Sequence, residues 1–413
     1  RRQSPNAEGQ PGTQLMNPFN TFQVARLPEI RFGSGAIDDL PEVLAGYGRN
    51  LLLVTGSRSL QQTPRWPQLL AALAQAGWAW QQVTVDGEPS PELVDDAVLA
   101  HRDAAVDVVV GIGGGSVLDA AKAIAGLLRS GHSVLDHLEG VGRGLPYLGP
   151  AVPFVAVPTT AGTGSEATKN SVLSRRGQDG FKKSFRDNRL MAEVAIVDPS
   201  LLASCPKDLI ASNGMDAVTQ LLESYVSLRA SPFTDALASS GMQAFREGFW
   251  HAWNEEDPLA QKGFERLAYA SLCSGVTLAQ CGLGSVHGLA SPLGAFFPIP
   301  HGVVCGTLVA AATRLNIRAL RERAPDGTAL RKYAEAALLL SGTMFSSETA
   351  AQEGLVDLLE EWTERLGLPR LARFGMTEQD LPRVVANCRG GSMQTNPLVL
   401  TDDELAELLR DRL

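Results

Sequence analysis

The chain contains 413 residues, of which 44% are apolar, and its formal net charge at pH 7 is -9. This length exceeds what one hydrophobic core usually supports, so we expect two globular domains. An acidic chain with a pI near 5.3 excludes nucleic acid as a partner, because nucleic-acid-binding proteins concentrate lysine and arginine on one face. We therefore expect the ligand to be a small molecule.

The cysteines and the apolar runs bear on the cellular compartment of the protein and on membrane association. The five cysteines form no CxxC pair and are odd in number, so we expect reduced thiols in a cytoplasmic protein. They are Cys205, Cys273, Cys281, Cys305 and Cys388. No apolar run reaches the ~18 residues that a membrane-spanning helix needs, and the N-terminus lacks the form of a signal peptide. We expect no membrane partner.

The first fifteen residues, RRQSPNAEGQPGTQL, are polar and rich in residues that break helices and strands. We interpret residues 1–15 as a disordered tail or as an addition to the natural protein, whose own start is then Met16.

Residues 16–203 alternate short apolar runs with amphipathic helical patterns. Predicted strands are LLLVT (51–55), QQVTV (81–85), VDVVVGIG (106–113), PFVAVPTT (153–160) and VAIVDP (194–199), and predicted helices are PQLLAALAQAG (67–77), ELVDDAVLAHRDA (92–104) and DAAKAIAGLL (119–128). This alternation predicts an α/β domain built on a parallel sheet. From residue 204 to residue 413 helical periodicity takes over, which predicts a second, all-helical domain.

A glycine-rich turn follows the third predicted strand. Gly113, Gly114, Gly115 and Ser116 lead directly into a helix. Glycines let the backbone approach a ligand closely, and the helix N-terminus presents free N–H groups to a phosphate. The turn thus indicates a diphosphate-bearing cofactor, although it matches neither GxGxxG nor a Walker loop, and a plain tight turn is the alternative.

A second loop, VPTTAGTGSEAT (157–168), follows the next strand. Thr159, Thr160 and Gly162 offer hydroxyls and exposed backbone at its strand end. Two such loops at the ends of neighbouring parallel strands form a crevice, which is where open α/β sheets bind ligands.

The helical half carries a second group of candidate residues. In GMDAVTQLLESY (214–225), Asp216, Gln220 and Glu223 share one helical face, which is either solvated or part of a metal site. The segment CGLGSVHGLASPLGAFFPIPHG (281–302) holds His287 and His301 among small residues that permit close approach. This pairing favours metal binding by the two histidines.

In these motifs the chain resembles the iron-containing (group III) alcohol dehydrogenase family. The resemblance runs from about Asn20 to the C-terminus and is carried by GGGSVLDAAK, PTTAGTGSEAT, VDPSLLASCPKDLIASNGMDAVTQLLESY, GLGSVHGLASPLGAFFPIPHG and NPLVLT, in that order. It implies the fold shared by these enzymes and dehydroquinate synthase, in which an α/β dinucleotide-binding domain faces an all-α domain. It also implies hydride transfer between an alcohol, aldehyde or ketone and NAD(P). A divalent metal, Fe or Zn, in the cleft between the two domains would assist this reaction, and the chain would form a homodimer.

The resemblance assigns roles to individual residues. It implies that Asp216, His287 and His301 bind the metal and act in catalysis through it. The cofactor-binding positions it implies are Gly113, Gly114, Gly115, Ser116, Asp119, Thr159, Thr160, Gly162, Asn170 and Lys183, with Lys182 as an alternative register for the lysine.

Two positions depart from the family pattern. Gln220 stands where the iron enzymes usually carry a further histidine ligand, and its amide oxygen is a weaker ligand than imidazole. Ser291 stands where many members carry a histidine proposed to relay a proton. The proton route is thus left to water, to the cofactor ribose or to Ser291 itself.

The end of the first predicted strand bears on the choice of cofactor. NAD-preferring relatives often have an acidic residue there that repels a 2′-phosphate, whereas this chain has Gly56, Ser57 and Arg58. The space at Gly56 and the charge of Arg58 favour NADP over NAD.

Other functions stay open. Gln220 favours a metal-independent NAD(P)H reductase similar to maleylacetate reductase, in which the metal is absent, and the missing histidines also fit a nucleotide-binding pseudoenzyme. A lyase similar to dehydroquinate synthase would need basic residues for a phosphorylated substrate, and the sequence shows no such cluster.

Overall fold

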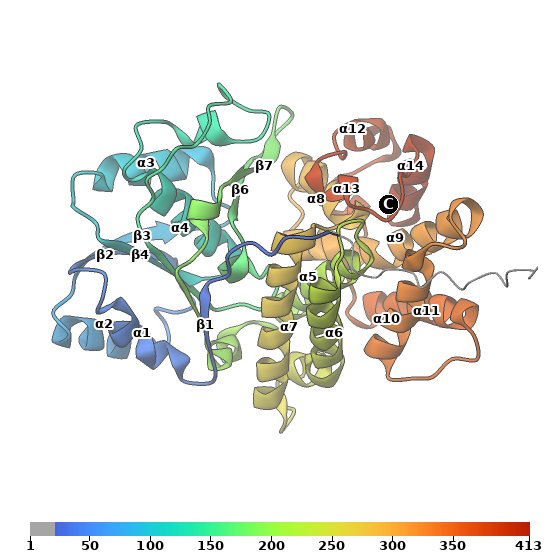
Figure 1. Ribbon diagram of the computed structural model, residues 1–413, viewed down its shortest axis with the longest axis horizontal. Coiled ribbons are helices and arrows are strands. Elements are labelled where there is room, and N and C mark those ends of the chain that lie inside the picture. Colours follow the sequence, from blue (N-terminus) through green and yellow to red (C-terminus); the bar gives the residue numbers. More distant parts are fainter. Residues whose placement is uncertain (1–20) are drawn as a thin grey trace, which may run out of the picture.

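The computed structural model describes residues 21–413, which form an α/β half and a helical half lying side by side (Figure 1). The predicted tail and Met16 lie outside the described residues.

The α/β half is built on a parallel sheet of six strands. They are β1 (Glu29–Phe32), β2 (Asn50–Gly56), β3 (Ala79–Val85), β4 (Val108–Gly113), β5 (Phe154–Pro158) and β8 (Val194–Val197), in the spatial order β1-β8-β5-β4-β2-β3. The helices of this half are α1 (Leu40–Leu44), α2 (Arg65–Gln75), α3 (Pro91–His101) and α4 (Gly115–Leu127). The predicted parallel sheet is confirmed, and β1 is an additional strand at one edge.

Alternation along the strands places helices on both faces of the sheet. Leu51 and Leu53 of β2 belong to one buried core, together with residues of α1 and α2. Leu52 and Val54 belong to the other, together with residues of α3 and α4. Because successive side chains of a strand point to opposite faces, each face has its own core.

A two-stranded antiparallel hairpin, which the sequence did not predict, lies outside this sheet. It consists of β6 (Asn170–Arg175) and β7 (Phe181–Arg186). The hairpin contacts α4 through β6 and α8 (Ser285–Phe296) through β7. It therefore bridges the two halves of the molecule (Figure 1).

The helical half follows β8. Its other helices are α5 (Lys207–Val226), α6 (Pro232–Trp253), α7 (Ala260–Cys281), α9 (His301–Arg323), α10 (Thr328–Ser341), α11 (Glu348–Arg365), α12 (Leu381–Ala386), α13 (Gly391–Gln394) and α14 (Asp402–Asp411). Helix α9 is long and apolar enough to cross a membrane, but 83% of its most apolar window is buried inside the protein. It is thus accounted for as a core helix.

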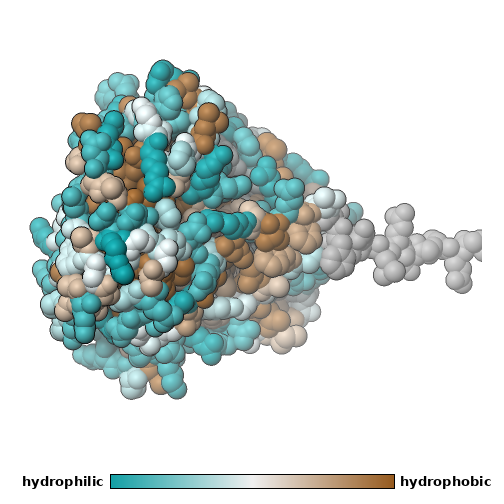
Figure 2. Space-filling model, turned by 60° about the vertical axis from the view of Figure 1, so that its left-hand side comes forward, coloured by the Kyte–Doolittle hydropathy of each residue, from teal (hydrophilic) through white to brown (hydrophobic). Residues whose placement is uncertain are grey.

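The face shown in Figure 2 is largely hydrophilic, with hydrophobic side chains gathered in smaller patches between the polar ones. The cleft that bears on function lies between the ends of β4 and β5 and the helical half, and both halves contribute polar side chains to it.

Candidate active site

The glycine-rich turn joins β4 directly to α4. Gly114 precedes the helix, and no side chain caps its first turn. The N–H groups of Gly115 and Ser116 therefore have no helical partner and are available to an anion. A side chain at Gly115 would meet the Thr163 hydroxyl at 2.6 Å, so glycine is needed where the two loops pack together.

The second loop lies beside the first, as predicted. Gly113 and Pro158 are partners at the ends of β4 and β5, and the Thr159 N–H donates to the Gly113 carbonyl at 2.9 Å. Gly162 packs against Asn213 of α5, where a Cβ would approach the asparagine at 2.9 Å. The loop thus joins the sheet to the helical half.

A cleft of about 480 Å³ opens between these loops, the β6–β7 hairpin and the helical half. The predicted site residues that line it are Gly115, Ser116, Asp119, Asn170, Lys183, Gln220, His287 and His301. The other predicted cofactor positions lie at the ends of β2, β4 and β5 or in the loops that follow, and are Gly56, Gly113, Gly114, Thr159, Thr160 and Gly162.

Asp119 and Lys122 belong to a buried network, in which the Lys122 ammonium lies 3.6 Å from the Asp119 carboxylate. The Lys122 ammonium is fully buried and donates to the Ser165 carbonyl at 2.8 Å, the Thr168 hydroxyl at 2.9 Å and the Asn170 carbonyl at 3.0 Å. The Asp119 carboxylate accepts from the Ser165 hydroxyl at 2.6 Å. The network holds α4, the second loop and β6 together at the cleft.

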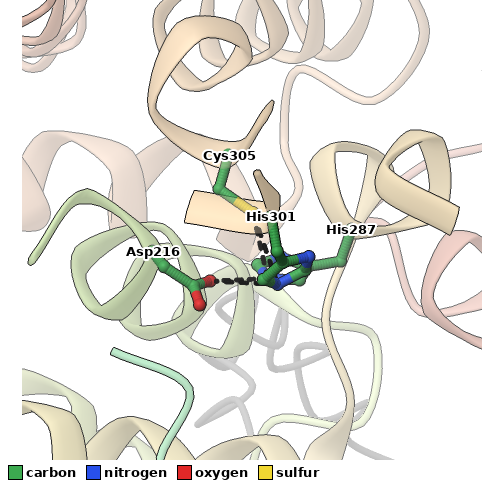
Figure 3. A group of neighbouring side chains, drawn as sticks. All are labelled: Asp216, His287, His301 and Cys305. Atoms are coloured by element: carbon green, nitrogen blue, oxygen red, sulfur yellow. Dashed lines mark hydrogen bonds and ion pairs between the residues drawn. The ribbon is translucent and has the colours of Figure 1, made fainter. Parts of the chain in front are cut away.

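A cluster of metal-type donors lies on the helical side of the cleft (Figure 3). His287 Nε2 lies 3.0 Å from Asp216 Oδ1, and His301 Nε2 lies 3.5 Å from the same oxygen. The three side chains come from α8, α5 and the first residue of α9. Folding thus brings two histidines that lie 71 and 85 positions after Asp216 to one oxygen of its carboxylate. These are the three residues to which the family resemblance assigns the metal.

Cys305 is the fourth member of this cluster. Its sulfur lies 3.4 Å from His287 Nε2 and 3.7 Å from His301 Nε2. The sequence suggested only a buried thiol, although the spacing of four residues from His301 on a helix places both side chains on one face. That spacing is the signal that could have identified Cys305.

Glu223 contacts the side of the His287 ring that faces away from Asp216. One of its carboxylate oxygens lies 2.6 Å from His287 Nδ1, and the other accepts from the Val286 N–H at 2.7 Å. The carboxylate therefore fixes the histidine with Nε2 toward Asp216 and also caps the first turn of α8. Such an orienting carboxylate is the usual partner of a metal-binding histidine.

The charges in the cluster shift one another's pKa. Burial would raise the pKa of the Asp216 carboxyl, but His301 and His287 outweigh it and hold that pKa well below its usual range. Burial lowers the pKa of His301, but Cys305 and Asp216 outweigh it and raise that pKa to about 9. The carboxylate and the imidazolium groups thus stabilise one another's charged forms, because they lie within 3.5 Å of each other.

The two departures from the family pattern have structural partners. The Gln220 amide nitrogen donates to the Gly162 carbonyl at 3.1 Å, the Thr163 carbonyl at 3.0 Å and the Ser274 hydroxyl at 3.0 Å. The Ser291 hydroxyl donates to the Lys182 carbonyl at 2.8 Å. Gln220 thus anchors the second loop to α5, and the Ser291 proton is already engaged by the hairpin.

Basic side chains do gather at the cleft, which corrects the view that the sequence contains no such cluster. They are Lys169, Lys182, Lys183, Arg186 and Arg229. Two of them are paired with acids, since Lys182 lies 2.9 Å from Glu88 and Arg186 lies 3.4 Å from Glu139. Folding brings together cations from the residue before β6, from β7 and from the turn after α5, which are separate segments of the sequence.

Comparison with known proteins agrees with this architecture. Residues 28–199 match the family model described as iron-containing alcohol dehydrogenase, and residues 210–413 match that of the C-terminal part of the Fe-containing alcohol dehydrogenase family. The NAD-dependent methanol dehydrogenase of Bacillus methanolicus is 30% identical, with 94% of this chain and 98% of the relative covered. Long-chain-alcohol dehydrogenase 1 of Geobacillus thermodenitrificans is 34% identical, with 87% and 89% covered.

A more distant relative and a solved structure are similar over nearly the whole chain. The NADPH-dependent butanol dehydrogenase of Clostridium saccharobutylicum is 28% identical, with 92% of this chain and 95% of the relative covered. The crystal structure of a 1,3-propanediol oxidoreductase superposes with a TM-score of 0.84 at 28% identity, covering 95% of this chain and all of that one.

The nucleotide-type loops, the cleft and these matches together define a nucleotide-dependent oxidoreductase. The chain belongs to the iron-containing alcohol dehydrogenase family. It is an NAD(P)-dependent alcohol dehydrogenase, which transfers hydride between the cofactor and an alcohol or its carbonyl counterpart. The predicted family, fold class and type of enzyme are confirmed.

Proposed function

We propose that Asp216, His287 and His301 hold a divalent metal ion in the cleft, and that the chain reduces small aldehydes or ketones with NADPH. The observation that carries this proposal is the convergence of both Nε2 atoms on one buried carboxylate oxygen, at 3.0 and 3.5 Å.

The donor set fits a divalent ion. Two imidazole nitrogens and a carboxylate oxygen are ordinary ligands of zinc and of iron. His287 is already held with Nε2 toward the other donors, because Glu223 occupies its Nδ1. A site preorganised in this way loses little conformational freedom when it binds an ion.

The residues of the chain divide the work of catalysis between them. When bound, the ion would polarise the substrate oxygen, and the nicotinamide would supply or accept the hydride. The free N–H groups of Gly115 and Ser116 hold the cofactor diphosphate, and Gln220 keeps the second loop against the helical half. Because the Ser291 hydroxyl is engaged by Lys182, the proton comes from cleft water or the cofactor ribose.

The choice of NADPH is supported by Arg58. This side chain is exposed just beyond β2, and no carboxylate within residues 21–413 forms an ion pair with it. A free guanidinium at the end of this strand suits a 2′-phosphate. The similar enzymes include one named as NAD-dependent and one named as NADPH-dependent, so membership of the family does not by itself select the cofactor.

The assembly and the location are also proposals. Edge strand β1 and the segment before it expose apolar side chains, among them Phe22, Val24, Ile30 and Phe32. An open strand edge with exposed apolar side chains supports a homodimer that covers it. All five cysteines are free, which supports a cytoplasmic, reducing environment.

The direct test is to measure bound metal by elemental analysis and to follow NADPH and NADH oxidation with short aldehydes, before and after chelation. We expect NADPH-dependent reduction that is lost on chelation and restored by the metal. Activity that survives complete metal removal would instead indicate a metal-free reductase, and inactivity toward every carbonyl in the presence of bound nucleotide would indicate a pseudoenzyme.

A further inference from the structure

Cys305 differs from the other cysteines in what its sulfur contacts. Its only side-chain or backbone hydrogen-bond partners among the described residues are the two imidazole nitrogens of His287 and His301. The Cys205 and Cys281 thiols contact backbone carbonyls of neighbouring segments instead, at 3.3 Å from Thr159 and 3.5 Å from Ser224 respectively. The Cys305 sulfur is thus aimed into the metal-type cluster, whereas those thiols serve packing.

The distances within the cluster match a tetrahedral zinc site. Zinc ligand bonds of about 2.0 Å to nitrogen or oxygen and about 2.3 Å to sulfur give donor separations of about 3.3 Å between nitrogen and oxygen and about 3.5 Å between nitrogen and sulfur. The two nitrogen–oxygen separations are 3.0 and 3.5 Å. The two nitrogen–sulfur separations are 3.4 and 3.7 Å, and all four donor atoms lie within 4.8 Å of one another.

Gln220 is held by contacts outside the cluster, so the fourth donor is Cys305. Its amide nitrogen is engaged by two loop carbonyls and the Ser274 hydroxyl, so the amide plane is fixed by three contacts. An amide oxygen is also a weak ligand for zinc or iron. Cys305 reaches the cluster from α9, one helical turn after His301, and its side chain is fully buried.

We propose that Cys305 is the fourth protein ligand of the metal, in place of a ligand at position 220, and that this thiolate makes the site selective for zinc over ferrous iron. The proposal rests on the proposed function only in requiring that the cluster binds a metal. A soft thiolate favours zinc, whereas a site of imidazole and carboxylate alone discriminates less. Zinc also accepts a fifth ligand during catalysis, so four protein ligands are compatible with substrate binding.

Cobalt(II) tests the sulfur ligand directly, because thiolate coordination gives an intense near-ultraviolet charge-transfer band that nitrogen and oxygen ligands do not give. The full-length protein is stripped of metal and titrated with Co²⁺ alone. We expect the band in the unaltered protein and in Cys273→Ser, a matched control in which another buried thiol is changed. We expect it to be absent from Cys305→Ser.

Zinc affinity supplies the second readout, measured by competition with a chromophoric chelator. Mutation of a residue that only orients a metal ligand lowers metal affinity roughly 10- to 100-fold. Loss of the ligand itself should lower the affinity further, so we expect Cys305→Ser to bind zinc about 100-fold or more weakly. We also expect Cys305→Ser to lose most of its preference for Zn²⁺ over Fe²⁺ in anaerobic competition. Circular dichroism of the metal-free variants identifies any that fail to fold, and Cys305→Ala then repeats the test.

The outcomes separate the two proposals. If Co²⁺ binds tightly without a charge-transfer band, Cys305 is not a ligand and this inference is overturned, while the metal site of the proposed function stands. If neither Co²⁺ nor Zn²⁺ binds the unaltered protein, the metal site itself fails and the inference fails with it.

Discussion

At the scale of single residues, Glu223 links the local structure of α8 to the chemistry of the cluster. The sequence marked it only as a carboxylate on the same helical face as Asp216. Its contact with His287, 64 positions away, appears only after α5 and α8 have packed together. Sequence spacing can place Glu223 on a face, but it cannot say which element that face meets.

Glu223→Gln should weaken metal binding without unfolding α8. The amide oxygen can still accept from the Val286 N–H, but the amide no longer increases the basicity of His287. We expect zinc affinity to fall about 10- to 100-fold, measured by chelator competition. The exposed Glu361→Gln is the control, and equal affinities of the two variants would contradict the orienting role of Glu223.

Arg58→Ala should shift the cofactor preference. A charge-assisted contact with a phosphate contributes roughly 1.5–3 kcal/mol, so we expect the ratio of kcat/KM for NADPH to that for NADH to fall at least about tenfold. Arg102→Ala removes another exposed arginine, at the end of α3, and should leave the ratio unchanged. An unchanged ratio in Arg58→Ala would mean that the guanidinium does not contact the cofactor.

Cys305 shows where residue-level reading of the sequence fell short. Asp216, His287 and His301 were found because their types and surroundings match a known pattern. Cys305 lies outside that pattern, and only its spacing from His301 pointed to the site. From the sequence, Gln220 indicates only that one of the family's metal ligands is missing. The structure shows that Cys305 brings a further donor atom to the same cluster.

At the scale of elements, the main sheet could be predicted and the hairpin could not. Strands such as β2 and β4 are buried on both faces and appear as continuous apolar runs. The segments NSVLSR and FKKSFR of β6 and β7 are polar because they border the cleft. Their strand structure depends on mutual pairing and on contacts with α4 and α8, which periodicity does not reveal.

Glu166, in the short helical turn Ser165–Ala167, should make stability depend on pH. Burial raises its pKa from 4.5 to about 7, although Lys122 opposes the shift. The folded protein therefore holds a proton that the unfolded chain releases, so this stability is fully present below pH 4.5 and is lost as the pH rises through about 7.

The test compares the free energy of unfolding of the unaltered protein with that of Glu166→Gln. We expect the variant to gain stability relative to the unaltered protein between pH 5 and pH 8, because its neutral amide does not titrate. The exposed Glu361→Gln should show no such change. If the difference in free energy of unfolding between Glu166→Gln and the unaltered protein does not depend on pH, the claim that Glu166 is buried as a neutral carboxyl is wrong.

At the scale of the whole molecule, the site exists only because two halves meet. The cofactor-type loops belong to the sheet, the metal-type donors belong to α5, α8 and α9, and the hairpin and Gln220 connect them. The sequence indicated both halves and the cleft through the order of the family motifs. The basic lining of the cleft was not foreseen, because it combines residues from several separate elements.

The proposed homodimer can be tested by light scattering coupled to size-exclusion chromatography. We expect a mass near twice 43.9 kDa. Ile30→Lys and Phe32→Lys place charges on edge strand β1, where the unaltered side chains are 38% and 42% exposed, and should shift the protein toward a monomer. A monomeric unaltered protein would refute the dimer, and a dimer unaffected by both changes would place its interface elsewhere.

The metal site is the central claim, and Asp216→Ala tests it most directly, because Asp216 Oδ1 is the atom on which both histidines converge. Purified Asp216→Ala and the unaltered protein are compared for bound metal by elemental analysis and for nucleotide affinity by fluorescence titration. We predict stoichiometric metal in the unaltered protein, none in the variant, and equal nucleotide affinity in both. Metal content that is unchanged in Asp216→Ala would contradict the account.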